Sequence, residues 1–225
     1  MSDEPPGLDM VVTSTDQLIA QLAGNLAPVR RLRSPARRAL LWLGLCIALG
    51  IALVLRFAHP ALFMPRFAVP RIALETIGTA LTAITATLAA FELSVPDGSP
   101  RWIWLPAPSL LLWLAASGLG CLQNGFSLGG PGGLIGDSGG CFGFILVFSV
   151  PLGAGLFWLL RRARPIDPLP VAALGTLAVA ATAAFVLQFF HGFDVTVIDL
   201  AFHLAAVGLI VLAGTVLRRP LLDAA

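Results

Sequence analysis

Three cysteines are the most reactive side chains in this chain of 225 residues, and two of them are spaced as a pair. Cys121 closes one apolar run and Cys141 opens the next, with a Gly-rich stretch of 19 residues between them. In an oxidising compartment two thiols can form a disulfide if their α-carbons approach within about 7 Å, and thiolates also bind soft metal ions. The pair predicts a redox- or metal-responsive site, although two separate thiols would leave the same pattern. Cys46, inside an apolar run, is expected to pack as a small hydrophobic residue.

Acidic and imidazole side chains also lie within or beside long apolar runs: Glu75, His191, Asp194, Asp199 and His203. Asp199 and His203 are four residues apart and would share one face of a helix. Carboxylate, imidazole and thiolate groups gathered in one place would suit a soft or borderline divalent metal ion. The spacing matches no zinc signature, so interhelical hydrogen bonds are the favoured explanation and a metal cluster is the alternative.

The elements that would position these groups follow from composition. The chain is 57% hydrophobic and only 12% charged, whereas soluble domains carry about 25% charged residues. Crossing a bilayer as a helix takes about 20 apolar residues. Segments of that length cover residues 39–57, 72–93, 103–121, 141–160, 169–190 and 197–217. The sequence therefore predicts an all-α, polytopic bundle of six transmembrane helices over 39–217, with an N-terminal segment at 1–38 and a tail at 218–225.

The arginines predict the orientation of this bundle. Eleven of the 14 flank alternate ends of the spans: Arg30, Arg31, Arg33, Arg37, Arg38, Arg101, Arg161, Arg162, Arg164, Arg218 and Arg219. Cytoplasmic loops carry the excess of basic residues, so both termini should lie in the cytoplasm. Trp42, Trp102, Trp104 and Trp158 fall near the same span ends, as expected of an interfacial aromatic belt.

The N-terminal segment contains a predicted amphipathic helix. Ser14 and Gln17 have the spacing of a capping box, and Pro28 ends the helix. One apolar stripe follows the cap and consists of Leu18, Ile19, Leu22 and Leu26. Such a stripe fits a helix lying on anionic lipid, helped by the arginines that follow it. It fits equally a helix that docks into the groove of a cytoplasmic partner.

Several of these features together resemble a known family. The string TDQLIAQLAGNLAPVRRLRSPARRALLWL at 15–43 is followed by the cysteine pair and by FFHGFD with a later histidine. This combination resembles the NrsF family, negative regulators of sigma F, which are bacterial membrane anti-sigma factors. The resemblance covers the chain from Thr15 to Arg219.

The resemblance implies a six-span protein of the bacterial inner membrane that sequesters an extracytoplasmic-function sigma factor and releases it under stress. Cys121 and Cys141 match the family's cysteine pair and would sense the signal. The cytoplasmic positions that match, and that would bind the sigma factor, are Thr15, Asp16, Leu18, Ile19, Leu22, Pro28, Val29, Arg30, Arg31 and Leu32.

Other function classes find less support in the sequence. It contains no HExxH zinc motif, no GxSxG nucleophile motif and no phosphate-binding loop ending in GK[ST]. We therefore expect no enzyme, no resident cofactor beyond transient metal at the cysteine pair, no direct nucleic-acid contact and no small-molecule substrate; membrane lipid is an expected partner. The rival hypothesis is a small transporter or channel with a polar path at Glu75, Asp199 and His203.

Overall fold

The computed structural model describes residues 15, 17–20, 23–24, 32–124, 135–190 and 196–222. It consists of two units, Met1–Leu32 and Arg33–Ala225. In the first unit the described residues between 15 and 24 are helical, and the side chains of Leu18 and Ile19 are 55% and 58% exposed. Thr15 and Leu32 are also described and exposed, and the other candidate docking residues lie outside the described part: Asp16, Leu22, Pro28, Val29, Arg30 and Arg31.

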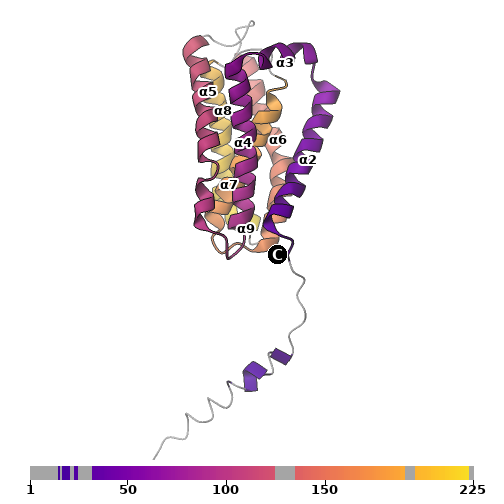
Figure 1. The fold of residues 1–225 in the computed structure, drawn as a ribbon, viewed down its shortest axis with the longest axis vertical. Coiled ribbons are helices and arrows are strands. Elements are labelled where there is room, and N and C mark those ends of the chain that lie inside the picture. The colour runs from indigo at the N-terminus through magenta and orange to yellow at the C-terminus, as the bar shows by residue number, and fades with distance from the viewer. Residues whose placement is uncertain are drawn as a thin grey trace, which may run out of the picture. The chain divides into compact units, whose positions relative to one another are not determined.

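The second unit is helical throughout its regular structure in the described residues (Figure 1). The long helices are α2 (Pro35–Phe57), α4 (Pro70–Leu93), α5 (Ala107–Asn124), α6 (Ile135–Leu160), α7 (Pro168–Leu187) and α8 (Val197–Val216). The short elements are α3 (Pro60–Phe67), α9 (Arg218–Leu222) and the 3₁₀ helices η1 (Pro100–Trp104) and η2 (Arg161–Ala163). Within the described residues six helices are long and apolar enough to cross a membrane. The predicted all-α bundle with six spans is confirmed.

Prolines begin many of these helices. Pro35, Pro70 and Pro168 occupy the first turns of α2, α4 and α7, where the fixed φ of proline suits the helix and its missing N–H costs nothing. Two of these starts are also capped by a side chain: Ser34 accepts a hydrogen bond from the Arg37 amide and Asp167 from the Leu169 amide. Proline often marks a loop, but here it marks the start of three long helices.

Two predicted loops are shorter than expected. Residues 58–71 lie between two predicted spans, but α3 occupies the middle of this stretch, with Pro60 in its first turn. The Gly-rich loop was expected at 122–140, yet Leu122–Asn124 belong to α5 and Ile135–Gly140 to α6. Cys141 therefore lies inside α6 and not at its first residue.

Helix α7 is the centre of the bundle. Its main partner is α4, and α6 and α8 also pack along it. In its apolar window 72% of the residues are buried, against 17% for both α2 and α8. Alanine, glycine and threonine dominate its buried positions, and such small side chains let neighbouring backbones approach closely.

Sequence order does not give spatial order around α7. Helix α5 packs on α4 and α8, and α6 packs on α7 and α8, while α5 and α6 do not pack side by side. Spans that follow one another in the chain are commonly neighbours. In the described residues, however, α8 contacts both α5 and α6. Helix α2 packs mainly on α4 and diverges from the other long helices towards α3 (Figure 1).

The bundle has two chemically different ends. The basic end contains the starts of α2, α5 and α7 and the ends of α4, α6 and α8, together with Arg33, Arg37, Arg101, Arg161, Arg162, Arg164, Arg218 and Arg219. The far end contains the opposite helix termini and α3. There Phe63 and Phe67 of α3 make edge contacts with Phe189, with ring centroids 5.4 Å apart in each pair.

A close contact between α4 and α5 gives a test of the packing. A Cβ atom on Gly78 of α4 would lie 2.8 Å from the backbone nitrogen of Trp113 in α5, whereas one on Gly118 would meet nothing within 4 Å. We expect Gly78→Ala to lower the free energy of unfolding by about 1–3 kcal/mol through overpacking. Gly118→Ala is the control and should change it by less than about 1 kcal/mol. Thermal unfolding of the detergent-purified protein measures both, and equal midpoints would contradict this packing.

Candidate functional site

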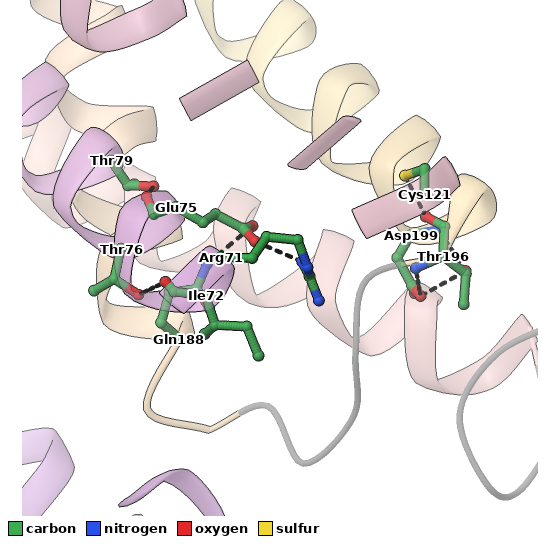
Figure 2. A network of polar contacts seen from close by, with 9 residues as sticks. All are labelled: Arg71, Ile72, Glu75, Thr76, Thr79, Cys121, Gln188, Thr196 and Asp199. Carbon is green, nitrogen blue, oxygen red and sulfur yellow. Dashed lines mark hydrogen bonds and ion pairs between the residues drawn. The ribbon is translucent and has the colours of Figure 1, made fainter. Parts of the chain in front are cut away.

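An ion pair at the far end lies on α4. Arg71 Nη1 is 3.7 Å from Glu75 Oε2, and these side chains are only 11% and 6% exposed. Gln188, which follows the last residue of α7, donates from Nε2 to Glu75 Oε1 at 3.3 Å. Figure 2 shows the Arg71 and Gln188 side chains converging on the Glu75 carboxylate. Glu75 thus connects the far ends of α4 and α7 by an interhelical hydrogen bond.

A second group of contacts connects α5 to α8. Cys121 Sγ donates to the backbone oxygen of Thr196 at 3.4 Å. Thr196 is the N-cap of α8 and forms a capping box with Asp199, whose carboxylate accepts from the Thr196 amide at 3.1 Å and from its hydroxyl at 2.7 Å (Figure 2). His203 Nδ1 contacts the Asp199 backbone oxygen at 2.7 Å. The Asp199 carboxylate therefore stabilises the start of its own helix.

Arg71 brings these two groups together. Its guanidinium lies against Gly120, the residue before Cys121, because a Cβ atom at Gly120 would collide with it. We call this set the far-end network: Arg71, Glu75, Cys121, Gln188, Thr196 and Asp199. A change in the charge or size of Cys121 would be felt by α4, α5 and α8 together.

Cys141 lies outside this network. It is buried in an apolar cluster with Ile145 of its own helix and residues of α7 and α8, including Ala183, Leu187 and Ala206. Phe142, beside it, meets Phe202 of α8 edge-on, with ring centroids 6.0 Å apart. Cys121 and Cys141 are not joined by a disulfide. What the two cysteine environments share is contact with α8.

A small cavity opens between α4, α5, α7 and α8. Its volume is about 50 Å³, and its polar lining residues are Glu75, Ser117, Gln188 and His203. Each buried water needs about 10–15 Å³ of cavity volume, so this cavity has room for roughly three waters. Glu75 and His203 are thus brought together, but Asp199 does not line this cavity. Further along α4, towards the basic end, the hydroxyls of Thr79, Thr82 and Thr87 donate hydrogen bonds to carbonyls of their own helix.

The proposed metal cluster is not assembled by the residues that can be placed. Among the described residues no three His, Cys, Asp or Glu side chains are grouped so as to hold one metal ion. His191 and Asp194 lie outside the described residues, so the five-residue cluster stays a prediction.

The basic end holds two buried polar side chains, Arg38 and Trp42, that were not among the predicted functional residues. Arg38 donates to Ser94 Oγ at 3.1 Å and to the Leu159 backbone oxygen at 3.5 Å, and it lies over the Phe91 ring at 5.3 Å. Trp42 donates from Nε1 to the Leu152 backbone oxygen at 3.2 Å. We call Arg38 and Trp42 with these partners the α2 latch.

The α2 latch corrects the expected positions of Trp42 and Arg38. Trp42 was assigned to an interfacial belt, but it is 1% exposed and belongs to the main core. Arg38 was counted only as a topological charge, yet its side chain is buried. Arg38 and Trp42 are four residues apart and therefore share one face of α2. This spacing was the only signal in the sequence that both side chains could point into the bundle.

The fold and the site define a polytopic helical membrane protein with a cysteine-containing polar network at one end and a basic surface at the other. The chain belongs to the family described as negative regulator of sigma F, whose family model matches residues 22–223. The resemblance seen in the sequence is thereby confirmed, although Thr15, Asp16, Leu18 and Ile19 precede the matched range. No curated protein and no solved structure matches the chain.

Proposed function

We propose that this member of the family is a membrane-bound anti-sigma factor that sequesters an extracytoplasmic-function sigma factor through residues 1–38. The family match over residues 22–223 carries the proposal, since it spans all six membrane helices and the end of the N-terminal segment. Membership of a regulatory family also supports a role other than catalysis.

The exposed apolar side chains of the N-terminal unit support a docking role. Leu18 and Ile19 lie on helical residues of a unit separate from the bundle, and more than half of each side chain is exposed. Adjacent exposed apolar residues on a helix are typical of helix-in-groove recognition. The sigma factor is the partner that we assign to them.

The distribution of arginines supports a cytoplasmic position for this segment. Nine of the twelve arginines in the described residues belong to the basic end, and only Arg56, Arg66 and Arg71 belong to the far end. Under the positive-inside rule this end faces the cytoplasm, where a sigma factor is found. The far end with the polar network then faces the periplasm across the inner membrane.

Sensing is assigned to Cys121 and Cys141. Modification of Cys121 by an oxidant or a soft metal ion removes the S–H donor that holds α5 to Thr196. Modification of Cys141 adds bulk to a cluster shared with α7 and α8. Both changes displace the packing of α8. To shift sigma-factor occupancy from 99:1 to 1:99, the signal must change the relative stability of the two states by about 5.5 kcal/mol.

Capture of a sigma factor by the intact protein is the direct test. The full-length protein in nanodiscs is mixed with purified sigma factors from the same genome and with core RNA polymerase. We expect it to retain one extracytoplasmic-function sigma factor and to prevent that factor from joining the polymerase. Retention of none, with holoenzyme formation unchanged, would overturn the proposal.

Replacing both sensing cysteines by serine should abolish release without abolishing binding. Serine at position 121 can still donate to the Thr196 carbonyl, so the resting contact survives, but its hydroxyl reacts with neither thiol oxidants nor soft metals. Sigma-factor occupancy is measured after addition of diamide or Cd²⁺. Cys46→Ser is the matched control, because Cys46 is also buried but lies in α2. Undiminished release from the Cys121→Ser/Cys141→Ser variant would exclude both cysteines as the sensor.

One observation keeps the transporter hypothesis in competition. Glu75 and His203 line the same cavity, as a polar path would require. Against it, Asp199 is engaged in the α8 capping box, and the threonine hydroxyls below the cavity bond within α4. Proton or metal flux in proteoliposomes separates the two functions, and we expect none above protein-free vesicles.

A further inference from the structure

The α2 latch lies where the proposed docking segment enters the membrane bundle. Helix α2 begins at Pro35, near the end of that segment, and Arg38 and Trp42 face inward from its first turns. Their acceptors belong to α4 and α6: the Ser94 hydroxyl and the backbone oxygens of Leu152 and Leu159. The start of α2 is therefore held by polar contacts to two other helices.

Beyond the latch, α2 is held only loosely. Its buried residues are Arg38, Ala39, Trp42, Cys46 and Gly50, and none follows Gly50. In the far half Ile51, Leu55 and Phe57 are 54%, 81% and 59% exposed. The position of the α2 start is consequently set by the contacts in its first half and not by its far end.

Helix α6 joins the latch to a candidate sensor. Its far half carries Cys141, and its basic half carries the Leu152 and Leu159 oxygens that accept from the latch. Pro151 lies between these halves, immediately before Leu152. Because proline has no N–H, it cannot bond to the Val147 carbonyl, and the helix ladder is interrupted there. A displacement of α6 around this point moves the acceptor carbonyls relative to α2.

We propose that Arg38 and Trp42 are positioning residues that transmit the state of α6 to the sigma-binding segment. This inference rests on the proposed function and names the route of its regulation. In the resting state the latch is closed and α2 presents the N-terminal segment in its binding geometry. Cys141 is modified either by a soft metal ion, which replaces the thiol proton, or by diamide, which takes up two electrons and two protons as the Cys141 thiol forms a disulfide with a second thiol. Either change shifts α6, the hydrogen bonds to Leu152 and Leu159 lengthen, and the start of α2 loosens.

The first readout needs no sigma factor. Hydrogen–deuterium exchange of backbone amides in residues 33–46 is followed in the full-length protein in nanodiscs, with and without diamide or Cd²⁺. We expect treatment to raise the exchange rate of these amides by about tenfold or more, equivalent to about 1.4 kcal/mol of lost protection. In Cys141→Ser the rate should not change on treatment. An unchanged rate in the treated native protein would overturn the latch whatever the sigma-factor result.

The second readout uses the sigma factor captured by the native protein. Trp42→Phe removes the indole N–H and part of the ring volume but keeps an aromatic ring in the core, while Arg38→Met removes the guanidinium. We expect the double variant to bind the sigma factor about tenfold more weakly before treatment, and treatment to weaken it less than about twofold further. Arg38→Lys, which keeps the charge, should recover part of the affinity.

Matched controls separate transmission from folding. Arg101→Met removes an equivalent charge from an exposed residue at the same end of the bundle but outside residues 1–38, and Trp104→Phe alters a tryptophan that is 74% exposed; both should respond as the native protein does. If the double variant does not fold, Trp42→Phe alone is used, with about half the loss expected. Native affinity and full release in a folded latch variant would overturn the latch alone. Failure of the native protein to bind any sigma factor would overturn the proposed function as well.

Discussion

Replacing Leu18 and Ile19 together by aspartate will abolish capture of the sigma factor by the full-length protein. Both side chains are exposed in the free protein and would become buried in the partner's groove. Burial of each is worth about 1.5–3 kcal/mol, so losing both weakens binding by about 10²-fold to 10⁴-fold. The charged replacements add a desolvation cost in the same direction.

Ala20→Asp is the matched control for this variant. It introduces one aspartate, instead of two, on the same short helix, and Ala20 lies about 200° around the helix from Leu18. Dissociation constants are measured with the protein in nanodiscs that contain anionic or only zwitterionic lipid. Unchanged sigma-factor binding by the double variant, with loss of contact to anionic lipid instead, would favour the alternative in which this helix lies on the inner leaflet.

Glu75→Leu will cause the largest loss of stability of any single substitution in the far-end network. It removes the carboxylate from the buried Arg71 guanidinium and from the Gln188 amide. Breaking a buried ion pair from one side costs about 3–5 kcal/mol. Adding Arg71→Met should recover part of this loss, because an apolar pair of similar volume removes the remaining buried charge.

Thermal unfolding of the purified protein in detergent measures the effect of Glu75→Leu. Asp97→Asn is the control, since it also removes one carboxylate but from an exposed position, and surface changes of this kind are usually within about 0.5 kcal/mol. If the Glu75→Leu and Asp97→Asn proteins unfold at the same temperature, the ion pair does not stabilise the bundle.

The number and placement of the spans could be predicted because a bilayer demands about 20 apolar residues for each crossing. The same reasoning could not find α3, because Pro60 and Pro65 look like loop residues although proline suits a first helical turn. It also made α6 too short, because glycines such as Gly139 and Gly140 were taken as loop residues. Transmembrane helices tolerate glycine more readily than soluble ones do.

Individual residues of the site could be named, but their partners could not. Glu75 and Asp199 stand out because ionisable groups within a membrane are costly. That Glu75 meets Gln188, and Cys121 meets Thr196, depends on which helices are neighbours. Sequence order suggested that α5 adjoins α6, whereas α8 contacts both. Arg38 and Trp42 were misread for a related reason, since composition does not tell a lipid-facing position from a bundle-facing one.

The central position of α7 has a consequence for how the protein is made. Helix α4 is inserted early, but its main packing partner is α7, the fifth span in chain order. Chains are synthesised from the N-terminus at about 5–20 residues per second. Helix α4 therefore waits in the membrane for several seconds before α7 is made. Assembly of the bundle is completed only when α7 and α8, in about the last quarter of the chain, have been synthesised, so a truncated product would not hold a closed bundle.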